Sequence, residues 1–161
     1  LHPAIYKTVI TLLNLLPSYM EICTDDPERF EESCRRFQAV TDVFQADGLH
    51  PGIVLNCYIT MAQDWMCLGE TEKALTVLEA YAELADGDIY PLRLKGDWYF
   101  DLLDDWFEQE LALGDYPPRS ESVIRRSMTQ AVADNPVFQS LSAEPRFRNI
   151  VERLKQNETE T

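Results

Sequence analysis

Few residues of this sequence have the types and spacing that catalysis requires. The two histidines, His2 and His50, each stand beside a proline, and neither belongs to an HExxH or ExxH pattern that would place metal ligands on one helix face. No nucleophile elbow or phosphate-binding loop is present. One cluster of carboxylates shares a helix face, but without a histidine or a matching second carboxylate helix: Asp101, Asp104, Asp105 and Glu108. The sequence therefore predicts no enzyme, no metal site and no cofactor.

The cysteines also lack a reactive arrangement. The chain has Cys23, Cys34, Cys57 and Cys67, none in the close CxxC spacing of zinc sites or redox pairs. Unpaired cysteines inside helical patterns pack like small apolar residues. We expect buried free thiols and a cytoplasmic location, where thiols stay reduced.

Length and net charge further restrict the classes of protein to which this chain can belong. A chain of 161 residues can bury one good core, so we expect a single domain over residues 1–155 and a frayed tail over 156–161. The net charge of −14 repels phosphate backbones, so these residues are not expected to bind DNA by themselves. No apolar run has the length of a membrane span, and no membrane partner is expected.

The elements that must position any binding residues are predicted to be helices. Apolar residues recur at helical spacing and no segment alternates as a strand does, which predicts an all-α fold of about seven helices in stacked antiparallel pairs. Pro17 is expected to kink or break a first helix over Pro3–Leu16, with a short helical piece over Ser18–Cys23 after it. Asp26 and Pro27 are a helix start signal. Residues 58–81 are predicted to form a tight helix pair.

An aromatic and acidic stretch follows between Leu92 and Leu113, and it admits three interpretations. Its aromatic residues form either a pocket for a cationic or amphipathic ligand, a dimer interface, or ordinary core with the acids in solvent. The candidate residues are Trp98, Tyr99, Trp106 and Phe107. The following residues 114–118 are expected to form a loop.

Half of the basic residues, seven of fourteen, lie between Arg119 and Lys155. Arg119, Arg125 and Arg126, near a predicted helix start, hold an anion, form a solvated face or make internal salt bridges. The basic segment as a whole is expected to pack against the acidic aromatic stretch or against a partner.

The central helix pair resembles a tetratricopeptide repeat. Tyr58, Met61, Ala62 and Trp65 occupy the first-helix positions of that motif, Gly69 the turn, and Ala74 and Leu78 the second-helix positions. Ala62 replaces the usual Gly, Leu78 the usual Phe, and Asp86-Gly87 stands where the closing proline would be.

The resemblance implies a groove lined by the first helix of the pair. The groove-facing positions it implies are Asn56, Ile59, Gln63 and Met66. Amide side chains can pair with an extended backbone while Ile and Met contact side chains, so the set suits a peptide or a partner helix. The alternative is that these residues pack on an adjacent helix pair.

The end of the chain resembles a second pattern. Asn135-Pro136-Val137-Phe138, then Leu141, then Glu144-Pro145-Arg146-Phe147 is similar to the ending of tetratricopeptide-type C-terminal domains in bacterial Xre-family helix-turn-helix regulators, with Glu144 in place of Asp. This resemblance implies a non-catalytic domain that senses a peptide or small signalling ligand and forms a homodimer. A DNA-binding module would then precede Leu1. The alternative is a stand-alone tetratricopeptide-like adaptor unrelated to transcription.

Overall fold

A computed structural model of the chain describes residues 1–110 and 119–159. Within these ranges it contains eight α-helices, one 3-10 helix and no strand, so the predicted all-α class is confirmed. The predicted loop over residues 114–118 lies outside the described residues. The elements are α1 (His2–Ile22), α2 (Pro27–Phe44), α3 (Ala46–Leu49), α4 (Pro51–Cys67), α5 (Thr71–Ala85), α6 (Leu103–Glu110), α7 (Glu121–Ala133), η1 (Pro136–Leu141) and α8 (Pro145–Glu158).

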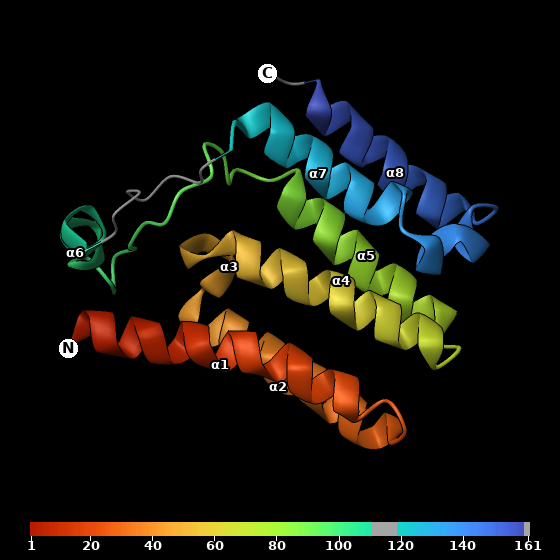
Figure 1. The fold of residues 1–161 in the computed structure, drawn as a ribbon, viewed down its shortest axis with the longest axis horizontal. Coiled ribbons are helices and arrows are strands. Elements are labelled where there is room, and N and C mark those ends of the chain that lie inside the picture. The colour runs from red at the N-terminus through yellow and green to blue at the C-terminus, as the bar shows by residue number, and fades with distance from the viewer. Residues whose placement is uncertain (111–118, 160–161) are drawn as a thin grey trace.

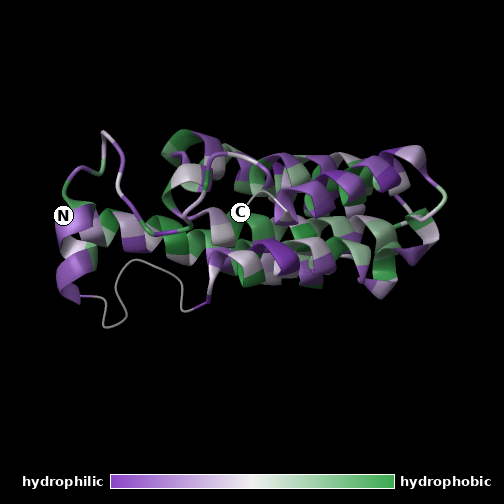
Figure 2. Ribbon diagram, turned by 90° about the horizontal axis from the view of Figure 1, so that it is seen from above, coloured by the Kyte–Doolittle hydropathy of each residue, from purple (hydrophilic) through white to green (hydrophobic). Residues whose placement is uncertain are grey.

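The long helices pack as neighbours in chain order. Figure 1 shows α1, α4 and α7 running in one direction, while α2, α5 and α8 return in the other. Each returning helix packs against the helix before it, and further contacts join α1 to α4 and α5 to α8. Seen from above in Figure 2, the long helices form two layers, with α6 set apart near the N-terminus. One continuous core runs between the layers from α1 to α8.

The first helix does not break at Pro17, so of the two expected outcomes, a kink or a break, the break is wrong. α1 is continuous from His2 to Ile22 with Pro17 inside it. A proline in a helix interior costs about 3 kcal/mol. Leu13 and Met20, one turn on either side, are both fully buried. Burial of two such side chains stabilises by roughly 3 to 6 kcal/mol, which offsets that cost and keeps the two halves in line.

The predicted packing of the central pair is confirmed. Ala62 and Ala74 are both fully buried at the contact between α4 and α5, where small side chains let the backbones approach. Gly69 has φ of +75°, a left-handed conformation that glycine adopts at little cost. Trp65 meets Phe30 of α2 edge to face, with ring centroids 4.7 Å apart.

The last helix is longer than predicted, so the frayed tail over 156–161 is partly wrong. α8 continues to Glu158 because Asn157 is buried, with its amide donating to the carbonyl of Ala85 at 2.9 Å. At the other end of α8, the Arg146 guanidinium binds both oxygens of Glu79 at 2.8 Å. The basic segment therefore pairs with α5 rather than with the aromatic stretch.

Three of the four cysteines are buried free thiols, as expected, but Cys67 is exposed at the end of α4. Burial raises the pKa of Cys34 to about 12, so its thiol stays protonated. Among the described residues, no helix combines the length and the apolar composition needed to span a bilayer.

The carboxyl group of Asp64 is partly shielded from solvent. Asp64 of α4 is half-buried, and within the described residues its Oδ2 atom is shielded from solvent without a hydrogen-bond partner. Burial, together with the nearby negative charge of Glu21, raises the pKa of Asp64 to about 6. Because the folded pKa lies above the unfolded one, folding stability falls as pH rises from about 4 through 6.

Replacing Asp64 by Asn should therefore stabilise the protein at neutral pH. We expect Asp64→Asn to raise Tm at pH 7 by roughly 2 to 4 °C, or about 1 kcal/mol after solvent screening, and to have little effect at pH 4. Calorimetry at the two pH values measures this difference. Asp88→Asn, at an exposed position, is the control. An equal effect of Asp64→Asn on Tm at both pH values would contradict the raised pKa of Asp64.

Candidate functional site

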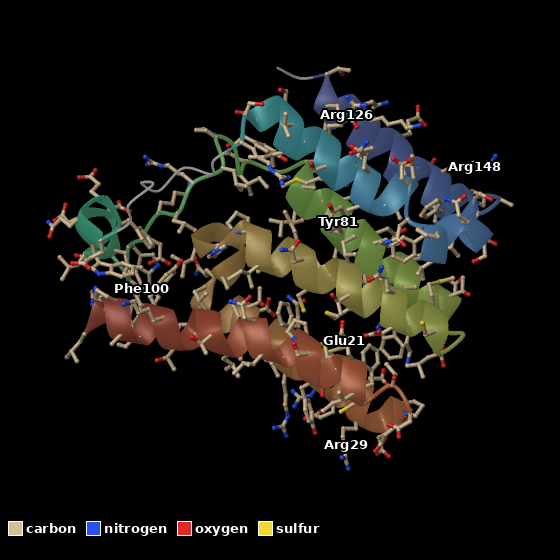
Figure 3. All side chains as sticks on the ribbon, viewed as in Figure 1. Glu21, Arg29, Tyr81, Phe100, Arg126 and Arg148 are labelled. Atoms are coloured by element: carbon tan, nitrogen blue, oxygen red, sulfur yellow. The ribbon has the colours of Figure 1, made fainter. Side chains whose placement is uncertain are left out.

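A groove of about 500 Å³ lies between α4 and α7 and is a candidate for a binding site. In Figure 3, Tyr81 of α5 lies between these two helices. The groove is lined by Gly52, Leu55, Asn56, Ile59 and Thr60 of α4, by Tyr81, by Arg119, and by Ile124, Ser127, Met128 and Ala131 of α7.

The groove contains two of the four residues that the sequence placed in it. Asn56 is exposed and Ile59 is half-buried, and both line its wall. Gln63 and Met66 lie further along α4, outside the lining, and Met66 packs against the main core. All the lining residues of α4 lie between Gly52 and Thr60, in the first part of the helix. The groove is thus shorter than the predicted stripe.

The lining combines an apolar wall with a few polar groups. Leu55, Ile59 and Met128 supply hydrocarbon and thioether surface, while Asn56 offers both a donor and an acceptor. Arg119, at the start of the α7 segment, adds a positive charge in a chain of net charge −14. This combination can hold an extended peptide by its backbone and contact its apolar side chains.

The tyrosine at the groove also holds the α7 wall to α5. The buried Tyr81 hydroxyl donates a hydrogen bond to the backbone carbonyl of Met128 at 2.9 Å. Burial raises the pKa of Tyr81, so the hydroxyl stays a neutral donor. Because Met128 is itself a lining residue, this bond fixes that part of α7 relative to α5. No sequence pattern identifies the pair, since 47 residues separate them.

Next to the groove, Arg125 is buried in a polar network rather than available to a ligand. It is 7% exposed, and its guanidinium binds Glu121 through Nε at 3.0 Å and Nη2 at 2.7 Å. Its Nη1 donates to the carbonyl of Asn157 at 3.1 Å and contacts the Asn157 side-chain oxygen. The guanidinium also lies over the Tyr90 ring, 3.6 Å from its centroid. Of the interpretations given for this arginine, internal pairing is therefore the one observed.

The four aromatic candidates do not form one pocket. Phe107 is fully buried in a small second core together with Tyr6 of α1 and Phe100. Figure 3 places Phe100 near the start of α1 and beside α6. Trp106 is half-buried against this core, with the Lys7 ammonium 4.8 Å from its ring centroid. The core interpretation therefore applies to Phe107 and, in part, to Trp106.

The other two aromatic candidates lie at the surface. Trp98 is 81% exposed and Tyr99 is 49% exposed. They line a cavity of about 350 Å³ with Asp97 and with residues 43–45 at the end of α2. The segment over Leu92–Leu113 is helical only from Leu103 to Glu110 within the described residues.

A further cleft, of about 530 Å³, lies between α7 and α8 and has no preferred sign of charge. Its three basic residues, Arg126, Arg148 and Lys155, are matched by Asp134, Glu152 and Glu158. In Figure 3, the labelled Arg126 and Arg148 lie on the two helices of this pair. Because its charges balance, this cleft is a weaker candidate for a specific ligand than the groove.

Compared with protein-family models, with curated proteins and with solved structures, the chain matches none. The described residues contain no group of three or more potential metal ligands. The groove between α4 and α7 therefore has to be interpreted from its own chemistry.

The buried network predicts that Arg125 supports the groove structurally. We expect Arg125→Met to lower the free energy of unfolding by about 2 kcal/mol, because the Asn157 acceptors lose their donor in a buried place. Thermal unfolding followed by circular dichroism should show a Tm roughly 4 to 8 °C lower. Arg126→Met, at the exposed neighbouring position, is the matched control and should leave Tm nearly unchanged. Equal effects of the two substitutions would contradict this role.

Proposed function

We propose that this chain is a non-catalytic, tetratricopeptide-like sensing and dimerisation domain of a helix-turn-helix transcriptional regulator, and that the α4–α7 groove binds its peptide ligand. The observation that carries the proposal is the groove of about 500 Å³ in which Asn56 and Ile59 face Met128. The tetratricopeptide-like interpretation is supported by three successive antiparallel helix pairs, in which α4 and α7 are the first helices of their pairs.

The chemistry of the lining indicates the kind of peptide. An extended backbone would pair with the Asn56 amide, and an apolar side chain would enter the space beside Ile59 and Met128. Arg119 favours a carboxylate on the ligand, either an acidic side chain or a C-terminus. A strongly acidic peptide would be repelled by the chain as a whole, so we propose a mainly apolar peptide with a single acidic group.

A second function uses the same groove without any link to transcription. In a stand-alone adaptor, the ligand would be a segment of a larger partner protein. The two functions differ in the sequence before Leu1: a compact helix-turn-helix segment there supports the regulator, and a different module supports the adaptor. The charge of −14 is compatible with both, because in either case these residues themselves do not contact DNA.

Selection from random peptides tests the proposed binding site. A phage-displayed library of random dodecapeptides is selected on the immobilised chain, and the enriched peptides are synthesised and titrated by calorimetry. We expect Asn56→Trp, whose indole would occupy the groove, to weaken binding by about tenfold or more, which corresponds to about 1.4 kcal/mol. Asn56 is exposed, so the larger side chain leaves the core undisturbed.

The matched control for this titration is Gln63→Trp. Gln63 lies two turns further along α4, on the same face but outside the groove lining. It should retain the affinity of the unmodified chain. Peptides whose affinity is unchanged by Asn56→Trp, or a library that yields no binding peptide at all, would overturn the proposed ligand site.

A further inference from the structure

The first helix carries a second apolar stripe that the core does not use. Tyr6, Val9, Leu13 and Met20 of α1 are buried against the rest of the protein. A separate row of side chains on the same helix remains exposed, with Leu15 at 62% and Ile22 at 74%. The complete row is Ile5, Thr8, Leu12, Leu15, Tyr19 and Ile22, which we call the α1 seam.

The spacing of the α1 seam is that of a coiled-coil contact. Its positions are separated by three and four residues in strict alternation over the whole helix, which is the heptad pattern of a surface that packs against another helix. Thr8 fits this pattern because its hydroxyl donates to the Ala4 carbonyl at 2.8 Å, so its polar group is already paired. The residues along the solvent-side flank, Ala4, Thr11 and Ser18, are small. A second helix could therefore approach closely.

No other part of the described structure covers this seam. α6 lies on a different side of α1, where Tyr6 meets Phe107 at a ring distance of 5.3 Å and Lys7 lies over Trp106. α2 and α4 pack against the buried stripe. Five large apolar side chains in one continuous row exceed the scattered surface residues of an ordinary monomer.

The seam is complementary to itself when a second copy lies antiparallel. A twofold axis placed between Leu13 and Asn14 pairs Leu12 with Leu15 of the partner copy. The same axis pairs Thr8 with Tyr19, and Ile5 with Ile22. All six seam positions thus find a seam position opposite, as a twofold interface between identical subunits requires.

Charge also favours a second copy at this face over any other. Two chains of net charge −14 repel each other, so a face without carboxylates favours their association. α1 carries one lysine and one glutamate, Lys7 and Glu21, and none of the seam or flanking positions is charged. α2, by comparison, carries four acidic and three basic residues in 18.

We propose that the α1 seam is the homodimer interface of this protein, formed by two antiparallel copies of α1. The inference rests on the proposed function, in which a regulator domain dimerises, and it adds the surface and the geometry. If each residue has an accessible area of about 200 Å² when fully exposed, the five exposed apolar residues of the seam present roughly 500 Å² per chain. A stable interface buries about 800 Å² per partner, so the seam supplies most of it, with the flanks contributing the rest.

Sedimentation equilibrium of the whole chain tests the interface. At about 50 µM, where a complex of micromolar Kd is mostly assembled, we expect twice the 18.6 kDa chain mass. Leu15→Glu should give the monomer mass, because it places two carboxylates at the centre of the paired helices. Asn14→Glu, on the polar side of the same helix, should remain dimeric. Circular dichroism establishes that both variants are folded, which the exposure of both sites favours.

Disulfide formation between copies tests the antiparallel direction. In a Cys67→Ser background, which removes the exposed native thiol, chains with Ile5→Cys are mixed with chains with Ile22→Cys and oxidised with diamide. The antiparallel pair predicts covalent dimers in the mixture and few in either variant alone. A parallel pair would instead cross-link each variant with itself.

A monomeric unmodified chain, a dimeric Leu15→Glu variant, or self-linking of each cysteine variant would each overturn the proposal. Raising the salt concentration should strengthen the dimer, because it screens the repulsion of two acidic chains. Titrating the Leu15→Glu variant with the peptide selected from the phage library distinguishes the failure of one proposal from the failure of the other. Lost dimerisation with retained peptide affinity supports the seam, whereas a dimer without any peptide ligand leaves the seam standing and removes the ligand site.

Discussion

The burial of one arginine fixes how the last helix pair joins the rest of the molecule. Removing a guanidinium from water costs several kcal/mol unless most of its donors are paired. The partners of Arg125 come from its own helix, from α8 and from the segment after α5, so none of these can shift without leaving a buried donor unsatisfied. Asn157 extends the constraint by donating to the last residue of α5. α7 is thereby held in one position, and with it one wall of the groove.

The two ends of the molecule are therefore held together by different forces. Between α1, α2 and α4, the contacts are mainly apolar and aromatic, such as the edge-to-face meeting of Phe30 and Trp65, with one hydrogen bond from the Tyr58 hydroxyl to the Gln38 side chain. Around α5, α7 and α8, directional hydrogen bonds and ion pairs add to the apolar core, including those of Tyr81 and Arg146. The hydrophobic effect is non-directional, whereas hydrogen bonds require a defined distance and angle. The groove lies where these two regions meet. Its α4 wall is apolar, and its α7 wall is held in place by hydrogen bonds.

Features that depend on neighbouring residues could be predicted from the sequence, and features that depend on distant partners could not. The start of α2 follows from Asp26, which accepts from the Arg29 amide three residues later, and the turn after α4 follows from Gly69. The continuity of α1 through Pro17 depends on a core that other helices supply. Two of the four groove positions line the groove for the same reason: helical spacing places Asn56 and Gln63 on one face, but only the position of α7 determines which of them has a wall opposite.

The two proposed surfaces share one structural element, and this has a mechanical consequence. α1 presents the seam on one side and packs against α4 on another, while α4 forms one wall of the groove. The opposite wall is held to α5 by Tyr81 and to α8 by Arg125, so a ligand that widens or narrows the groove would shift α4 relative to α7. That shift would be passed to α1 through the apolar contacts between α4 and α1. From α1 it would be passed to the paired helix of the second copy. Coupling of this kind requires the ligand to favour one position of α4 over another. By reciprocity, if the peptide changes the affinity of dimerisation by some factor, dimerisation through the seam changes the affinity for the peptide by the same factor.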